Sequence, residues 1–202
     1  MKKKTRRSLG EITWTGFWGH LKTVLTHKWF VFRYSCYLGI PWRGLIHDLS
    51  KFHPVEFWEG VRYWTGTASP IAVCKGLTGQ SRAWLHHKGR NPHHYEYWVD
   101  YLDDGGVPQR MPFKYIVELL ADYLAAGRTY NGKDFTLEGE YKWWQQKLKY
   151  DKPKMHPAVK EFVSWILCMF SESPETLTYF RKYKKQYEVR YKEISAKHYG
   201  EQ

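Results

Sequence analysis

The sequence of 202 residues predicts an all-α, single-domain helical bundle. Apolar residues recur at a spacing close to 3.6 along much of the chain, and Gly and Pro separate these periodic segments. No alternating strand pattern of useful length and no internal repeat occur. Hydrophobic residues make up 43% of the chain, a proportion typical of a globular protein. A chain of this length is sufficient for one core, so one domain is expected.

Helix-start and helix-stop signals divide the first part of the chain. A long helix, capped by Ser8 or Thr13, is expected to end near Tyr37. Pro41 then opens a short second helix that includes the next histidine, and Pro54 opens a third.

The middle of the chain is expected to begin with a loop, because residues 65–80 are rich in Gly, Thr and Ser. A helix through His87 follows. Asn91 and Pro92 are a good N-cap and first-turn pair, so a further helix is expected from there to about Leu102.

Four more helices are expected in the second half of the chain, beginning at Pro112, Thr136, Pro157 and Pro174. The expected organisation is a basic segment over residues 1–10, a helical domain over 11–172 and a basic C-terminal helix over 173–202. That last helix either packs on the domain or extends from it.

The formal net charge of +12 is concentrated near both termini. A charge of this size favours anionic partners such as nucleic acid, nucleotides or anionic lipid, although it also serves as a solubilising surface. No aromatic-basic RNA motif or zinc finger occurs. The three cysteines lie far apart without a CxxC motif, and neither a signal peptide nor a membrane span is predicted. A cytoplasmic location is therefore expected.

The central motif is the adjacent pair His47 and Asp48, which follows a short apolar run and precedes Lys51 by three residues. Imidazole suits Zn, Fe, Ni and Cu, and a carboxylate adds affinity for Mn or Mg. Neighbouring side chains point to different faces inside a helix, but both can reach one metal ion at a helix end or kink. An isolated His-Asp pair is also common as a surface pair or a cap.

A second signal is Asp122, which stands in the apolar stretch Leu119–Leu124. A carboxylate on the buried side of a helix is costly unless it is paired or bound to a cation. Pairing with one of the many Arg or Lys residues is the alternative to metal binding. Several helices of a bundle can direct ligands to one interior point. Candidate ligands besides this aspartate and the His-Asp pair are His27, His87, His93 and His94.

The order His27, His47-Asp48, further histidines and Asp122 resembles the H…HD…D signature of the HD-domain metal phosphohydrolase superfamily. Residues 45–51, Leu-Ile-His-Asp-Leu-Ser-Lys, are similar to its apolar-apolar-HD-x-x-K helix. More closely, the HD-x-S-K-F motif at 47–52 and the H-x5-HH-x3-W motif at 87–98 resemble a family of uncharacterised bacterial and phage proteins. This resemblance covers roughly residues 20–150 and favours His87 over its neighbour His86.

The resemblance implies an HD-domain-like bundle with two divalent ions, of Fe, Mn or Zn, with Mg as a further candidate. It implies that one ion is held by His27, His47, Asp48 and Asp122. The second would use Asp48 as a bridge, together with His87 and with His93 or His94. Only five residues separate His87 from His93, fewer than in the better-known binuclear enzymes, so either of the paired histidines remains a candidate ligand.

The implied function is a phosphohydrolase, a phosphomonoesterase or phosphodiesterase, acting on a nucleotide or related phosphate ester. Asp48 would be catalytic, Lys51 would be catalytic or contact a phosphate oxygen, and Arg90 is a second candidate for phosphate binding. The side chains of Lys51 and Arg90 could instead be solvated surface groups. Glu56 could accept a proton or only favour a helix dipole. The competing functions are a di-iron oxygenase on the same ligands and a nucleic-acid-binding module with structural metals.

Overall fold

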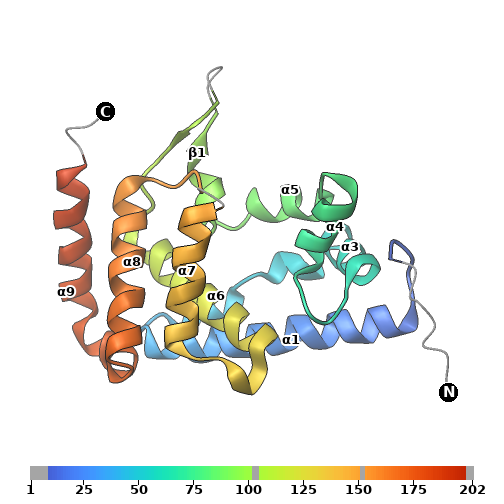
Figure 1. Cartoon of the computed structure of the whole chain (residues 1–202), viewed down its shortest axis with the longest axis horizontal. Helices are drawn as coiled ribbons and strands as arrows, with labels where there is room; N and C mark the ends of the chain where they lie inside the picture. The colour runs from blue at the N-terminus through green and yellow to red at the C-terminus, as the bar shows by residue number, and fades with distance from the viewer. Residues whose placement is uncertain (1–8, 102–104, 151–152, 199–202) are drawn as a thin grey trace. The chain divides into compact units, whose positions relative to one another are not determined.

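The computed structural model describes residues 9–101, 105–150 and 153–198, and it confirms the all-α class (Figure 1). Most of the basic segment predicted at residues 1–10 lies outside the described residues. The helices are α1 (Trp14–Tyr37), α2 (Pro41–Ile46), α3 (Pro54–Tyr63), α4 (Pro70–Thr78), α5 (Arg82–Lys88), α6 (Phe113–Asn131), α7 (Leu137–Tyr150), α8 (Pro157–Glu172) and α9 (Glu175–Lys197), with short 3-10 helices η1 (Leu49–Phe52), η2 (Tyr95–Trp98) and η3 (Gly132–Asp134). None of these helices is long and apolar enough to cross a membrane.

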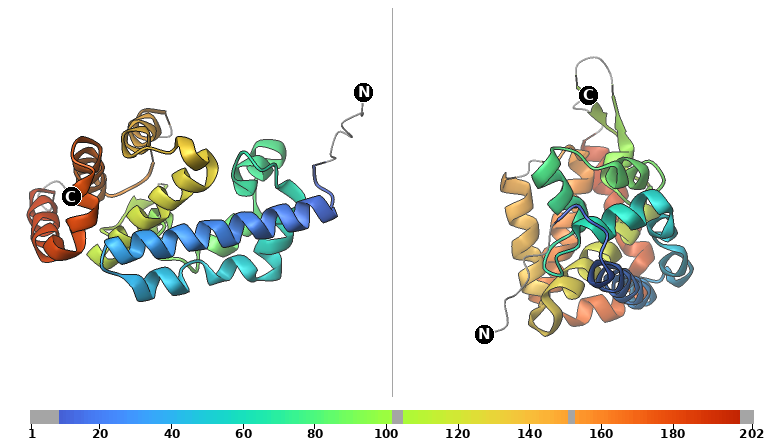
Figure 2. Two further views of the ribbon diagram at one scale, coloured as in Figure 1. Left: turned by 90° about the horizontal axis from the view of Figure 1, so that it is seen from below. Right: turned by 90° about the vertical axis from the view of Figure 1, so that its right-hand side faces the viewer.

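The chain divides into two compact units. The first unit contains the residues up to Thr26 and Asp48–Arg90, and the second unit contains His27–His47 and the residues from Asn91 onward. Helix α1 contributes residues to both, and it is one uninterrupted helix (Figure 2). The bond between His47 and Asp48 also passes from one unit to the other.

The large core lies in the second unit, around helix α6. Every residue of α6 from Ile116 to Ala125 is buried, because apolar side chains occupy nearly all of its faces there. Helices α7, α8 and α9 pack in sequence, α7 on α8 and α8 on α9. In α9 the ring of Phe180 stacks on that of Tyr187 at 4.6 Å, and the Tyr191 hydroxyl donates to the Met111 carbonyl at 2.7 Å. The C-terminal helix thus packs on the bundle.

The first unit is organised around α3, which packs against both α4 and α5. Ser81 caps α5 by accepting a hydrogen bond from the Trp84 amide at 2.9 Å. The Glu59 carboxylate on α3 in turn accepts the Ser81 hydroxyl and the Ala83 amide. These bonds fix the start of α5 on α3, and α5 carries His87.

The prediction of a loop over residues 65–80 is wrong, because α4 occupies Pro70–Thr78. Pro70 has the fixed φ of a first helical residue, and Gly79 ends the helix in the left-handed conformation with φ of 76°. The many Gly and Thr residues of this segment suggested a loop, but the segment forms a helix that buries the side chain of Cys74.

The helix predicted from Asn91 to Leu102 is also wrong. Over the described residues 91–101 the chain forms the short helix η2 and then the two-residue strand β1 (Val99–Asp100), which pairs antiparallel with β2 (Val107–Pro108). The Trp98 indole donates to the Pro92 carbonyl at 2.7 Å and closes the segment into a compact turn. His93 and His94 therefore extend from a turn and not from a helix.

Candidate metal centre

The His47-Asp48 pair lies just beyond the end of a helix. The sequence predicted that this short helix includes His47, but α2 ends one residue earlier, at Ile46. The φ and ψ of His47 are −53° and 133°, which are not helical values. Asp48 has φ of 52° and ψ of 33°, and it is the only residue other than Gly with positive φ in the described chain. Aspartate tolerates this left-handed conformation better than most residues. The helical constraint that separates neighbouring side chains is therefore absent here.

Three imidazoles surround one carboxylate in the second unit, and the group of His27, His47, His93 and Asp122 is called here the Asp122 cluster. The Asp122 carboxylate lies 3.0 Å from Nε2 of His27, 3.5 Å from Nε2 of His47 and 3.9 Å from Nε2 of His93. All four side chains are buried. Donor atoms around a tetrahedral ion with bonds of about 2.1 Å are separated by about 3.4 Å, which falls within this range.

Four separate segments of the second unit supply this cluster. His27 lies on the buried face of α1 between Val24 and Val31, and Asp122 lies in the buried centre of α6. Burial raises the pKa of the Asp122 carboxyl, but hydrogen bonds and charge from His27 and His47 outweigh it and hold the pKa well below its usual value. The alternative that Asp122 pairs with Arg or Lys does not describe this arrangement, since its partners are histidines.

Glu118 lies one helical turn before Asp122 on α6 and is also buried. Its carboxylate lies 3.1 Å from Nδ1 of His47 and 2.5 Å from Nη2 of Arg43. Sequence reasoning missed this residue. The signal was present, because two carboxylates four residues apart on an apolar helix share one face.

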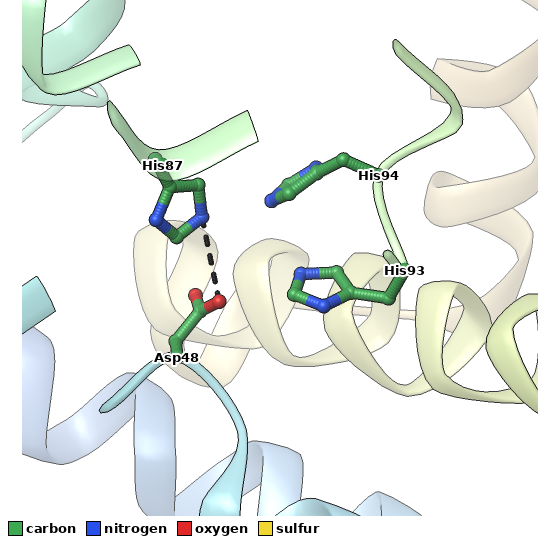
Figure 3. A group of neighbouring side chains, drawn as sticks. All are labelled: Asp48, His87, His93 and His94. Carbon is green, nitrogen blue, oxygen red and sulfur yellow. Dashed lines mark ion pairs between the residues drawn. The ribbon is translucent and has the colours of Figure 1, made fainter. Parts of the chain in front are cut away.

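The first unit contains a related arrangement centred on Asp48. Its Oδ1 lies 3.3 Å from Nε2 of His87, the ion pair that is dashed in Figure 3. Nδ1 of His87 lies 2.7 Å from the buried Glu56 carboxylate, and Nδ1 of His86 lies 2.6 Å from the other Glu56 oxygen. Burial alone would raise the pKa of the Glu56 carboxyl, but its bonds to His87 and His86 lower it. Glu56 thus positions two imidazoles.

The remaining predicted site residues have distinct surroundings. Lys51 Nζ lies 2.6 Å from Oδ2 of Asp48, so this lysine is paired with the predicted bridging carboxylate. Arg90 is exposed and donates to the His86 carbonyl at 3.2 Å. His93 is buried and His94 is partly exposed, with ring centroids 4.2 Å apart on consecutive residues (Figure 3). The substrate roles of Lys51 and Arg90 stay predictions.

The next histidines were not predicted to belong to the site, and each makes contacts of another kind. His53 and His156 accept hydrogen bonds from backbone amides at the starts of α3 and α8, as their His-Pro sequences indicated. His20 is buried, and burial together with the charge of Lys51 lowers its pKa to about 4. His198, which sequence reasoning assigned to the chain end, lies 2.9 Å from the Glu161 carboxylate.

The donor set fits a transition-metal ion. In two overlapping sets of the second unit, His27 with His47 and Asp122, and His47 with His93 and Glu118, one donor atom from each residue lies within 4.8 Å of the others. Imidazole and carboxylate are the usual ligands of Zn, Fe and Mn in proteins. The fold and this site define an all-α protein with buried His and carboxylate groups that could hold a metal ion.

The comparison with protein families identifies one family for the chain. The sequence profile of the family of unknown function DUF5662 matches residues 16–169, and the chain belongs to this family. The matched span includes every candidate metal ligand, from His27 to Asp122. No curated protein and no solved structure matches the chain.

Proposed function

We propose that this protein is a metal-dependent phosphohydrolase that acts on a nucleotide or related phosphate ester through two metal ions. The observation that carries the proposal is the Asp122 cluster, in which three imidazole Nε2 atoms surround one buried carboxylate. Such a site has the neutral nitrogen donors and the anionic oxygen donor that Fe, Mn and Zn bind.

The second ion is proposed from the arrangement around Asp48. His87 and His47 are each held through Nδ1 by a buried glutamate, Glu56 and Glu118 respectively, which is the usual support of a metal-bound imidazole. Asp48 follows His47 directly, so their Cα atoms are about 3.8 Å apart wherever the units lie. The assignment of Asp48 as the bridging ligand rests on the resemblance of the His47-Asp48 pair to the HD motif.

Two divalent cations would lower the pKa of a bound water and neutralise charge on a phosphoryl oxygen. The residues of the chain would then orient the substrate. Lys51 lies beside the Asp48 carboxylate and would bring a positive charge to a phosphate oxygen. Arg90 is exposed just after the end of α5, the helix that carries His87, and it would supply a second cation.

The proposal is tested by metal analysis of untreated protein, followed by a screen of phosphate esters and nucleotides with the metal that is found. We expect a transition metal in the purified protein and phosphate release that Asp122→Ala and Asp48→Ala abolish. His198→Ala is the matched control, because its imidazole lies 2.9 Å from the Glu161 carboxylate and its loss should leave metal content unchanged.

Two outcomes would replace the proposal with the competing functions. Bound iron together with oxygen-dependent turnover and no phosphate release would identify an oxygenase. Tight binding of DNA or RNA that weakens steeply with salt, without any turnover, would identify a nucleic-acid-binding module. Absence of metal from the untreated protein would contradict the metal site itself.

A further inference from the structure

A cavity lies in the second unit between α1 and α6. Its volume is about 220 Å³, and it is lined by Phe30, Arg33, Tyr34, Tyr37 and Arg128. The first four residues form one stripe along α1, and Arg128 comes from the last turns of α6. The walls therefore combine two guanidinium groups with three aromatic rings.

The two arginines have no acidic partner within the described residues. Neither guanidinium forms an ion pair there, and Arg128 instead lies over the rings of Phe30 and Phe135, each 6.0 Å from the guanidinium carbon. Arg128 is half-buried, so its charge is less screened than that of a fully exposed cation. Paired guanidinium groups without a carboxylate are suited to a phosphate, which they bind through several hydrogen bonds.

The helices that line the cavity also carry the metal-site residues. On α1, Phe30 follows His27 by three residues and Tyr34 follows it by seven. On α6, Arg128 follows Asp122 by six residues. With a rise of 1.5 Å per residue, Phe30 lies about 5 Å beyond the level of His27 along α1, and Tyr34 and Arg128 lie about 10 Å along their helices beyond the levels of His27 and Asp122.

We propose that this cavity binds a second anionic group, of the phosphate class, carried by the substrate of the Asp122 cluster. This inference rests on the proposed phosphohydrolase function, and it narrows the substrate to phosphate esters with two anionic groups about 10 Å apart. The cavity is smaller than the roughly 300 Å³ at which pockets for complete small ligands begin, so it accepts a terminal group and not a whole nucleotide. The rings of Phe30 and Tyr34 would contact the part of the substrate that joins the two anions.

The first experiment measures binding of inorganic pyrophosphate by calorimetry, separately from turnover. The variants are Arg33→Gln/Arg128→Gln, Asp122→Ala, and a combination of all three substitutions. Arg82→Gln is the control, because Arg82 is exposed on α5 in the first unit. We expect Asp122→Ala to retain a pyrophosphate site that the arginine substitutions weaken about 10–100-fold, as expected when hydrogen bonds to a charged group are lost. Equal affinity with and without both arginines, in the Asp122→Ala background, would overturn the proposal.

The second experiment separates a substrate group from a free anion that acts as an effector. For substrates with a second phosphate, Arg128→Gln should raise KM about tenfold at unchanged kcat, and it should leave esters with one phosphate unaffected. If added inorganic phosphate instead alters turnover of a singly phosphorylated ester and Arg128→Gln removes that effect, the ligand is a free anion and the substrate assignment is overturned. Retained pyrophosphate binding with no turnover of any ester would refute the hydrolase function but not the anion site.

A folding control accompanies both experiments. Thermal unfolding of Arg33→Lys/Arg128→Lys shows whether the charges alone maintain the fold, since lysine keeps the charge but not the planar donor pattern. With both lysines and an unchanged unfolding temperature, we expect pyrophosphate affinity between those of the parent protein and the double Gln variant. Affinity equal to that of the double Gln variant would show that charge contributes nothing, and this would contradict an anion site.

Discussion

Nδ1 of His47 lies 3.1 Å from Oε1 of Glu118, and Nδ1 of His87 lies 2.7 Å from Oε2 of Glu56. A carboxylate at Nδ1 can accept the hydrogen of that nitrogen, and with a metal ion bound this would leave the lone pair of Nε2 for the ion. In both cases that Nε2 faces an aspartate, Asp122 for His47 and Asp48 for His87. Each unit thus contains a glutamate, an imidazole and an aspartate in the same order.

Glu118→Gln tests this support of His47. The amide keeps the shape of the side chain but removes the charge that holds the imidazole and that Arg43 neutralises. We expect metal affinity about 10–100-fold lower, with the helical content retained, because such supporting carboxylates contribute this much. A competition titration with a chromophoric chelator measures the affinity. Glu138→Gln is the control, since Glu138 is exposed on α7, and equal affinities of the two variants would contradict the role of Glu118.

The backbone of Asp48 gives a second prediction. Asp48→Gly and Asp48→Ala both remove the carboxylate, but only alanine is strained at φ of 52°. We therefore expect the glycine variant to be more stable than the alanine variant by about 1 kcal/mol, although both should lose metal-dependent activity. Urea unfolding measures the difference, and an alanine variant as stable as the glycine variant would show that this conformation is not retained.

The sequence predicted most helix starts because the signals are local. Thr13, Thr136 and the His-Pro pairs act on amides within the next turn, so their effect can be inferred without knowing the fold. Asp122 was identifiable for a similar reason, as a charged residue in an apolar run. The turn at His93 was not, because it depends on the bond between the Trp98 indole and the Pro92 carbonyl, and the start at Asn91 satisfies every local helix rule. Glu118 carries the same local signal as Asp122, a carboxylate on an apolar helix, but its contact with His47, which is distant in sequence, could not be inferred.

Gly44 gives a prediction about the packing that supports the HD motif. A Cβ atom at Gly44 would lie 2.5 Å from Cβ of Ser35 and 3.1 Å from Cα of Phe32, so α2 approaches α1 more closely than any larger residue permits. We expect Gly44→Ala to destabilise the protein by about 1–3 kcal/mol, the usual cost of overpacking.

The matched control for that substitution is Gly76→Ala on α4. A Cβ atom there meets nothing within 4 Å, so the change should stabilise the helix by about 0.5–1 kcal/mol through backbone entropy. Thermal unfolding of the two variants should therefore shift in opposite directions. A shift in the same direction would show that the close approach at Gly44 does not limit the side chain.

Glu140 provides a pH-dependent prediction. Its carboxyl is buried on α7, in space that Gly127 leaves open, and burial together with the Asp122 charge raises its pKa to about 8. Between its usual value of 4.5 and about 8 the folded state holds a proton that the unfolded state releases, so stability falls as the pH rises through this range.

Glu140→Gln removes the titration. In metal-stripped protein we expect Glu140→Gln to be more stable than the parent by on the order of 2–4 kcal/mol at pH 8, with a smaller difference near pH 5. Urea unfolding at both pH values measures this difference. Glu138→Gln, an exposed change on the same helix, should show no such trend, and a Glu140→Gln advantage that is independent of pH would mean that the carboxyl does not titrate in the folded protein.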